Sequence, residues 1–204
     1  MTKKSARRGA DATRDQIVEA ALETLAKEGF AGASSRAIAR RGGFNQALIF
    51  YHFGTLDSLL LAALDRTSGQ RLEQYRAAVE EVHSLDDLIA VAARAYAEDR
   101  ESGHMAVVAQ MVAGSVARPE LAPAVLARME PWLELADEAL TRALAGAPAF
   151  AQLPVRDLAY AIVTFYLGVN LLTHLDADHA RTDAVFARLE ALAPLLNAAA
   201  SAEV

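Results

Sequence analysis

The sequence predicts an all-α fold. Apolar residues recur at three- and four-residue intervals along most of the 204 residues, which is the period of an amphipathic helix. Alanine, the strongest helix former, occurs 46 times, and the alternation of β-branched residues that indicates strands is nearly absent. With 53% hydrophobic residues and a mean hydropathy of +0.16, the chain can bury a substantial core.

The first predicted helix begins at Thr13. The Thr13 hydroxyl can accept the amide hydrogen of Gln16 while the Gln16 side chain reaches back, which is the arrangement of a capping box. Gly29 is expected to end this helix, with Phe30 folded back onto the last turn. The predicted buried stripe of the helix comprises Ile17, Ala21, Leu22 and Leu25.

A short helix follows the first one. Ser34 or Ser35 is its predicted N-cap, and it runs to Arg40 or Arg41. The paired glycines at 42 and 43 then force a tight turn, because glycine adopts left-handed backbone at no steric cost.

A second short helix is predicted after the turn, over residues 46–51, with Asn45 as its N-cap. Thr55 is the predicted N-cap of the helix that comes next. Two short helices joined by a glycine turn form a helix-turn-helix pattern, so we expect residues 13–55 to be a DNA-binding domain.

Residues 56–204 are predicted to form one larger helical domain. Proline is expected to kink or divide its helix at position 131 and to disturb the last helix at position 194. After the helix that begins at Thr55, the predicted helices span residues 84–102, 105–116, 119–145, 154–175 and 182 to the tail, with Gly103 ending the first of these.

Charge is distributed unevenly along the chain. The 20 basic and 26 acidic residues give a net charge of −6, but residues 1–53 carry +4 and the remaining residues carry −10. This asymmetry indicates an N-terminal part that faces a polyanion and a second part with a different role. Residues 1–12 are expected to form a flexible basic arm.

The composition also excludes several classes of protein. The absence of cysteine rules out disulfides, thiolate zinc sites and thiol catalysis, and it fits a reducing cytosol. Residues 1–12 lack the apolar stretch of a secretory signal, so we expect a cytoplasmic protein. Residues 158–175 carry no formal charge and reach the lower length limit of a membrane span, but their polar side chains favour a buried helix and no membrane partner.

The segment from Ser34 to Leu60 resembles the DNA-binding segment of TetR-type (tetracycline-repressor-like) transcriptional regulators. The resemblance lies in the order and spacing of residues and, with the first helix, covers about a quarter of the chain. It depends on Ile38-Ala39, Gly43, Asn45, Ile49, the aromatic block Phe50-Tyr51-His52-Phe53, Thr55, Asp57 and Leu59.

DNA recognition requires groups that meet base edges and groups that hold the flanking phosphates. Gln46 and Ala47 occupy the first turn of the second short helix, where Gln46 can hydrogen-bond to base edges and Ala47 can contact a thymine methyl. The predicted phosphate contacts are Ser34, Ser35 and Arg36 at one side, and Tyr51, His52 and the amide of Thr55 at the other; Asn45 and Phe50 complete the predicted DNA-binding set, and Phe53 is expected in the core.

Two positions depart from the family pattern. Leu56 stands where the family usually has a lysine, so one expected phosphate contact is missing. Phe44 and Asn45 stand where a valine and a serine are common, and Phe44 either packs inward or projects toward DNA. The loss of one cation predicts a shallower salt dependence of DNA binding.

One short helix specifies too few base pairs alone, so we expect a homodimer on a palindromic site of double-stranded DNA, as the resemblance also implies. The last two helices are predicted to form the interface. In this interpretation Ile162, Phe165, Val169 and Leu172 face the subunit interior, Tyr166, Asn170 and Thr173 meet the partner, and Val185, Leu189, Leu192 and Leu196 complete the interface.

Family members often bind a small effector that alters DNA binding. An apolar or weakly polar effector is expected here because few charges interrupt the relevant helices. The candidates are Tyr96, His104, Met105, Met111, Trp132, Phe165, Tyr166 and Asn170. For each of these residues taken singly, an ordinary place in the helical core is the favoured interpretation.

Enzyme functions are poorly supported, and no catalytic residue, cofactor site or metal site is predicted. Glu101 and His104 have a metal-site spacing, but Gly103 should break the helix that would align them. His174, Asp176, Asp178 and His179 cluster in a predicted loop, where solvated acidic turns are common. The resulting prediction is a ligand-responsive transcriptional repressor; the alternatives are a helical small-molecule-binding protein with little DNA binding and a metallohydrolase.

Overall fold

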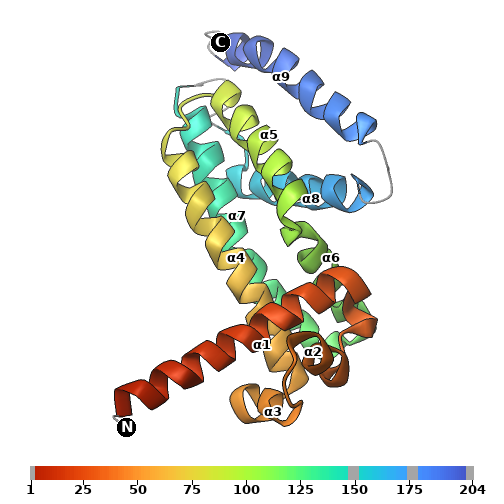
Figure 1. The fold of residues 1–204 in the computed structure, drawn as a ribbon. Helices are drawn as coiled ribbons and strands as arrows, with labels where there is room; N and C mark the ends of the chain where they lie inside the picture. The colour runs from red at the N-terminus through yellow and green to blue at the C-terminus, as the bar shows by residue number, and fades with distance from the viewer. Residues whose placement is uncertain (1–2, 147–151, 174–178, 201–204) are drawn as a thin grey trace. The chain divides into compact units, whose positions relative to one another are not determined.

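The structure is a computed structural model that describes residues 3–146, 152–173 and 179–200. Helices dominate this part of the chain and no strand occurs in it, so the all-α prediction is confirmed (Figure 1). The helices are α1 (Lys3–Gly32), α2 (Ser35–Gly42), α3 (Ala47–Phe53), α4 (Leu56–Glu80), α5 (Leu85–Ser102), α6 (His104–Ala117), a 3-10 helix η1 (Pro119–Leu121), α7 (Ala122–Leu144), α8 (Val155–Thr173) and α9 (Ala180–Ala200).

The chain divides into two compact units. The first unit comprises residues 1–69 and 106–127, and the second comprises residues 70–105 and 128–204. The helix-turn-helix segment therefore shares its unit with most of α6 and the beginning of α7. The sequence pattern does not indicate this association, because the two segments are separated by the whole of α5.

Helix α1 starts ten residues before the predicted start at Thr13, and residues 3–12 have helical backbone. Inside this longer helix the Thr13 hydroxyl donates to the carbonyl oxygen of Gly9 at 2.9 Å. The Gln16 side-chain amide donates to the carbonyl oxygen of Gly42 at 2.9 Å and does not reach back to Thr13. The predicted capping box is therefore wrong, because a threonine hydroxyl can equally bond to the preceding turn of a continuing helix.

The predicted break at Gly29 is confirmed: this residue has φ 72° and interrupts the helical backbone of α1. The next residue, Phe30, donates its backbone amide hydrogen to Oε1 of Gln110 at 2.9 Å. The Phe30 ring occupies the space that a Cβ atom at Gly114 would need. Two residues of α6, one turn apart, thus fasten the end of α1.

The first unit has an apolar core. It is formed by one side of α1, buried residues of the two short helices, the beginning of α4, and α6. Such side chains contribute about 1.5–3 kcal/mol each when fully buried. The fully buried large side chains include Ile17, Leu25, Ile38, Ile49, Leu59, Leu60, Leu64 and Met111.

The second unit has a core in which α4, α5 and α7 meet. Tyr75 and Val79 of α4 pack with Ala95 of α5, and the Tyr75 and Trp132 rings lie edge to face with their centroids 6.0 Å apart. Leu135 and Ala139 of α7 complete the cluster, and Tyr166 of α8 packs against it.

Helix termini in the second unit follow local chemistry, as predicted. Ser84 is the N-cap of α5 and accepts the amide hydrogen of Asp87 at 3.2 Å. Gly103 adopts left-handed backbone, φ 71°, and ends the helix. Pro131 does not divide its helix, since α7 continues through it, and α9 likewise continues through Pro194.

The orientation of α8 differs in part from the prediction, and Ile162, Tyr166 and Val169 are half-buried. Asn170 and Thr173, expected to meet a partner, are buried within the second unit. Phe165 and Leu172, expected inside, are 47% and 63% exposed. Tertiary hydrogen bonds decide this orientation, because the Thr173 hydroxyl bonds to that of Thr182 on α9 at 2.8 Å.

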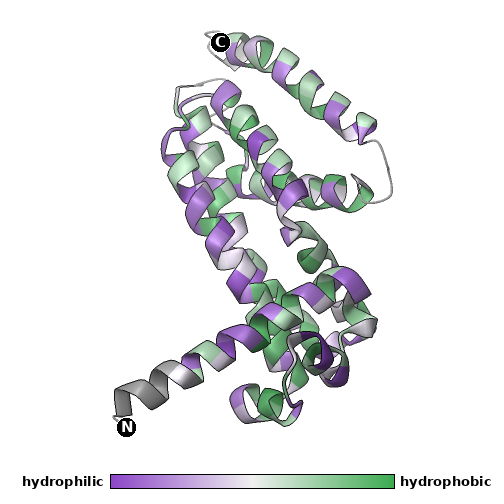
Figure 2. Cartoon of the chain, in the orientation of Figure 1, coloured by the Kyte–Doolittle hydropathy of each residue, from purple (hydrophilic) through white to green (hydrophobic). Residues whose placement is uncertain are grey.

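Hydrophobic residues recur along both α8 and α9 (green in Figure 2). Among the described residues, α8 is the one helix that is by itself long and apolar enough to cross a membrane. Core helices of soluble proteins can have the same length and composition. Apolar side chains remain exposed on both helices: Tyr160, Phe165, Leu171 and Leu172 on α8, and Val185, Leu192, Leu195 and Leu196 on α9.

Candidate nucleic-acid interface

Helix α2 begins at the residue that its sequence predicts. Ser34 is the N-cap, with extended backbone, and its hydroxyl oxygen accepts the amide hydrogen of Ala37 at 3.2 Å. Ala37, Ile38 and Ala39 form the buried side of the helix. Ser34 itself is exposed, so this helix N-terminus can present its amide groups to an anion.

The turn between α2 and α3 uses both of the residue types that predict it. Gly43 has φ 69°, a left-handed conformation that glycine adopts without strain. Asn45 Oδ1 accepts the amide hydrogen of Ala47 at 2.9 Å. Helix α3 therefore starts at Ala47, one residue later than predicted, and it ends at Phe53 instead of Tyr51.

Phe44 packs inward, which decides between its two predicted orientations. Its ring lies where a Cβ atom at Gly42 would stand, close to the Ala20 side chain of α1. Gly42 is therefore required for the close approach of this ring, while Gly43 is required for its backbone conformation.

Helix α3 is anchored by one fully buried side chain. Ile49 has no exposed surface, whereas Phe50 is 47% and Tyr51 81% exposed. Asn45, Gln46 and Ala47 at the beginning of the helix are also exposed. The helix thus presents a polar first turn and an aromatic end, the two groups predicted to meet base edges and phosphates.

The basic residues of α2 divide between structure and surface. Arg41 donates to the Thr24 hydroxyl at 3.0 Å and forms an ion pair with Glu28, so it fastens α2 to α1. Arg36 is exposed and forms no ion pair within the part of the chain that is described. An exposed guanidinium next to a helix N-terminus is suited to a phosphate group.

The beginning of α4 is fixed by a local cap and by a distant arginine. The Thr55 hydroxyl accepts the amide hydrogen of Ser58 at 3.0 Å, which confirms the predicted cap. Arg118 donates two hydrogen bonds to the Asp57 carboxylate, at 2.7 and 2.6 Å, and these bonds raise the pKa of Arg118. The sequence offered no signal for this pair because its members lie 61 residues apart.

Part of the predicted effector set meets in the second unit. The Tyr96 and Phe186 rings stack with centroids 4.8 Å apart, and the Tyr96 hydroxyl lies 3.4 Å from that of Thr173. His104 is buried, with its ring centroid 5.8 Å from that of Trp132. The Asn170 side-chain amide donates to the Tyr166 carbonyl oxygen at 2.9 Å.

Other members of that set lie elsewhere. Met111 is fully buried in the first unit, Met105 is buried in the second unit, and Phe165 is exposed. Two hollows in the second unit are lined by different residues. One of about 380 Å³ lies between α4 and α5 and includes Gln74 and Arg94, and the other, of about 450 Å³, lies between α7 and α8.

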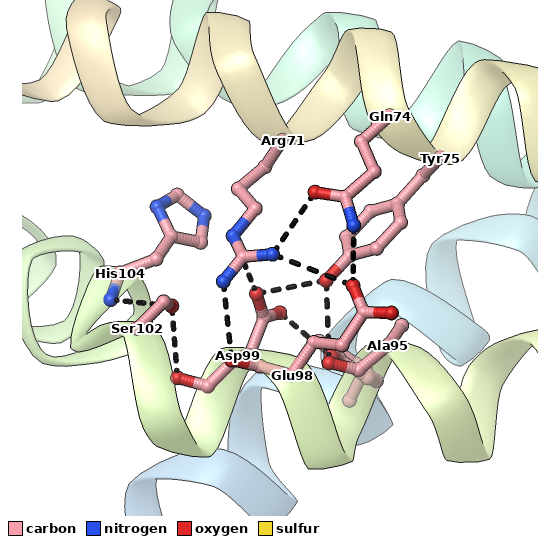
Figure 3. A network of polar contacts seen from close by, with 9 residues as sticks. Arg71, Gln74, Tyr75, Ala95, Glu98, Asp99, Ser102 and His104 are labelled. Atoms are coloured by element: carbon pink, nitrogen blue, oxygen red, sulfur yellow. Dashed lines mark hydrogen bonds and ion pairs between the residues drawn. The ribbon is translucent and has the colours of Figure 1, made fainter.

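A buried carboxylate that the sequence interpretation missed is the centre of a polar network in the second unit (Figure 3). Asp99 is 2% exposed and accepts the hydroxyl hydrogens of Tyr75 at 2.9 Å and Tyr166 at 2.7 Å. Arg71 Nε lies 3.3 Å from Asp99 Oδ1, and the same guanidinium donates to the Glu98 carbonyl oxygen at 3.1 Å.

The network shifts the titration of its neighbours. Burial, followed by the negative charge of Asp99, raises the pKa of both Tyr75 and Tyr166 far above the ordinary value. Burial lowers the pKa of His104, and the nearby Asp99 charge opposes this shift. One signal in the sequence could have indicated Asp99. It lies four residues after Ala95, so the helical period puts a carboxylate on the apolar side of the helix.

The metal-site patterns find no support in the described residues. Gly103 separates Glu101 on α5 from His104 on α6, as predicted, so the two side chains do not share a helix face. Residues 174–178, with His174, Asp176 and Asp178, lie outside the described residues. Within the described ranges no three His, Asp or Glu side chains are grouped to hold a metal ion.

Comparisons with known proteins agree with this geometry. Residues 17–63 match the family described as bacterial regulatory proteins, tetR family. The HTH-type transcriptional repressor NicS of Pseudomonas putida is 38% identical over 56 residues, which are 28% of this chain and 26% of NicS. The HTH-type transcriptional regulator UidR of Escherichia coli is 26% identical over 117 residues, 55% of this chain and 57% of UidR.

The likeness in fold extends much further than the likeness in sequence. The transcriptional regulator FadR of Bacillus subtilis, solved in complex with stearoyl-CoA, aligns with 87% of this chain and 95% of its own, with a TM-score of 0.73 and 18% identity. In sequence, by contrast, the alignments span about a quarter of NicS and just over half of UidR.

Proposed function

We propose that this chain, whose residues 17–63 match the model of the tetR family of bacterial regulatory proteins, belongs to that family, binds double-stranded DNA and regulates transcription as a repressor. The observation that carries the proposal is the exposed polar first turn of α3 beside the exposed N-terminus of α2, both built on an apolar core. In this proposal residues 13–55 carry DNA binding, and residues 56–204 carry effector binding and dimerisation.

The DNA contacts follow from the chemistry of the exposed groups. Gln46 and Ala47 meet base edges in the major groove. Phosphates are held on both sides of the groove by amides, hydroxyls and cations. The proposed phosphate contacts are Ser34, Ser35 and Arg36 at α2, and Tyr51, His52 and Thr55 at the end of α3, with Asn45 and Phe50 at the edge of the same surface.

We further propose that the chain acts as a homodimer on a palindromic operator. The exposed apolar side chains of α8 and α9 support this arrangement, because burying them against a second copy removes apolar surface from water at about 25 cal/mol per Å². A twofold assembly requires a twofold-related pair of half-sites.

A small, mostly apolar effector is proposed to release the chain from its operator. The structure of FadR, which is similar in fold and was solved in complex with stearoyl-CoA, supports a ligand-binding role for this fold. The second unit, with buried aromatic and polar side chains, is the proposed location. The chain is proposed to act in the cytoplasm, and to function as a regulator and not as an enzyme, without a cofactor.

Selection of bound sequences from a random duplex library tests the proposal directly. An enriched inverted repeat is expected, with two half-sites about one helical turn apart. A chain that enriches no sequence and shows no salt-dependent DNA affinity would instead be a helical small-molecule-binding protein. Repeating the selection with cell extract would reveal an effector that abolishes binding.

Two substitutions separate base recognition from phosphate binding. Gln46→Ala is expected to weaken binding to the best site by about 1–3 kcal/mol and to relax the preference at one base position. Arg36→Ala is expected to weaken binding to all sequences alike. Titrations against a panel of operator variants measure both effects, and an equal loss on every variant for Gln46→Ala would refute this division.

A further inference from the structure

We propose that Arg14 of α1 is an additional DNA-phosphate ligand, held in place by the ring of Phe53 at the end of α3. This inference rests on the proposed DNA-binding function. It assigns to α1 a direct contact with DNA.

The geometry joins α1 to the last residue of α3. The guanidinium carbon of Arg14 lies 4.8 Å from the centroid of the Phe53 ring. A guanidinium at this distance from an aromatic ring is attracted to its electron-rich face. The ring is partly buried and Arg14 is exposed, so the contact fixes the position of a charge that solvent can still reach.

The aromatic end of α3 leads to this charge. The Tyr51 and His52 rings meet edge to face, with centroids 5.0 Å apart, and the His52 and Phe53 rings are 6.5 Å apart. Tyr51 and His52 are the groups proposed to hold a phosphate on this side of the groove. Arg14 therefore lies at the end of a row of rings that starts at a proposed phosphate contact.

The charge of Arg14 is not neutralised by the acidic residue beside it. Asp15 forms an ion pair with Arg66 of α4. Asp11, one turn before Arg14, is exposed, and no ion pair between Asp11 and Arg14 occurs in the described structure. The Arg14 guanidinium thus retains its donors for an incoming anion.

Arg14 would supply a cation on a side of the proposed DNA-binding surface where the described residues otherwise place none. The beginning of α2 has the exposed Arg36, whereas the end of α3 presents only a hydroxyl and an imidazole, and Leu56 at the beginning of α4 is apolar. Arginine suits the position because its planar group can stack on a ring and donate two parallel hydrogen bonds to a phosphate.

The salt dependence of DNA binding tests the assignment. Equilibrium binding of the full chain to a selected operator and to a random duplex is measured from 50 to 300 mM salt for the wild type and four variants. Arg14→Gln is expected to bind about tenfold more weakly at 0.1 M salt and to reduce the slope of log K against log salt by about one, equally on both duplexes.

Two variants examine the role of the ring and one serves as control. Arg14→Lys is expected to keep the slope but lose part of the affinity, and Phe53→Leu to lower the affinity while keeping the slope. Lys27→Gln removes the same charge from the same helix, at a residue paired with Glu23 at 3.7 Å, and is expected to change neither quantity. Thermal unfolding followed by circular dichroism checks that each variant is folded.

The outcomes distinguish this inference from the function on which it rests. If the wild type binds no duplex in a salt-dependent way, the proposed function fails. If the wild type binds and Arg14→Gln retains its full slope, or if Lys27→Gln loses as much as Arg14→Gln, DNA binding stands and the assignment of Arg14 is overturned.

Discussion

The two compact units differ in where they keep their polar groups. In the first unit Thr24 is the buried polar side chain among the described residues, and the cations and hydroxyls lie on the surface. In the second unit the buried polar side chains include a carboxylate, an imidazole, an amide and two threonine hydroxyls: Asp99, His104, Asn170, Thr173 and Thr182.

The two units also differ in how many large apolar side chains they expose. The second unit exposes most of the large apolar side chains that the described structure leaves in solvent, and they concentrate on α8 and α9. The first unit exposes few of them, among them the aromatic residues Phe50 and Tyr51 of α3. A buried charge costs free energy unless it is paired with an opposite charge. A large exposed apolar surface is unfavourable unless a partner covers it.

The contrast shows which interactions fix the arrangement of helices in each unit. An apolar core holds α3 rigidly and tolerates changes in the surface groups that contact DNA. A buried polar network is stable only when every member has its partner, so it fixes one arrangement of α4, α5 and α8 and responds strongly to the loss of any member. The three predictions below test this contrast, beginning with the largest effect.

Removal of the buried carboxylate is expected to have the largest effect. Asp99→Ala should reduce the free energy of unfolding by about 3–5 kcal/mol, because it leaves the Arg71 charge without its buried carboxylate and the Tyr166 hydroxyl without its acceptor, while the Tyr75 hydroxyl keeps the Ala95 carbonyl oxygen. Urea unfolding followed by circular dichroism measures the loss.

Glu98 provides the matched control for Asp99. It is the preceding residue on α5 and accepts a hydrogen bond from Gln74 at 2.6 Å, but it is exposed. Glu98→Ala should cost less than about 1 kcal/mol. Equal losses for the two variants would show that the second unit does not depend on its buried charge.

The stability of the first unit should depend on side-chain volume in its core instead of on a buried charge. Gly114→Ala is expected to cost about 1–3 kcal/mol, since the new methyl group would overlap the Phe30 ring. Gly69→Ala, on α4, meets open space and should be neutral or stabilise the chain by up to about 1 kcal/mol. Thermal unfolding of both variants measures the difference, and a neutral Gly114→Ala would mean that α6 and α1 are not closely packed.

The smallest expected effect is on pH dependence. Because burial lowers the pKa of His104, the folded chain binds fewer protons than the unfolded chain just below the ordinary histidine pKa of about 6.5. The contribution of His104 to stability is therefore complete above about pH 6.5 and is lost as the pH falls, by at most about 1.4 kcal/mol per unit.

Urea unfolding at pH 7.5, 6.5 and 5.5 checks this prediction. His104→Gln should lose less stability than the wild type over this range, while His83→Gln, at an exposed position, should follow the wild type. Parallel curves for the wild type and His104→Gln would contradict the prediction. The charged groups that contribute to the shift of His104 are Asp99 and Arg71.

Much of the fold and part of the candidate site could be predicted from the sequence. The caps at Ser34, Thr55 and Ser84 and the left-handed glycines were found because a cap depends on residues three or four positions apart. The exposed beginning of α3 followed from the same short-range pattern. Such features are contained in any window of a few residues. The short-range pattern did not decide that Ile49 is the buried anchor of the helix.

The tertiary structure alone decided the rest. Whether Thr13 starts a helix, which side of α8 is buried and where Phe44 points all depend on segments that are distant in the sequence. The same holds for Asp57 with Arg118, 61 residues apart, and for Asp99 with Tyr166, 67 residues apart. Local hydrogen bonding determines where helices begin and end, whereas the free energy of burying or pairing a side chain depends on neighbours that only the folded chain brings together.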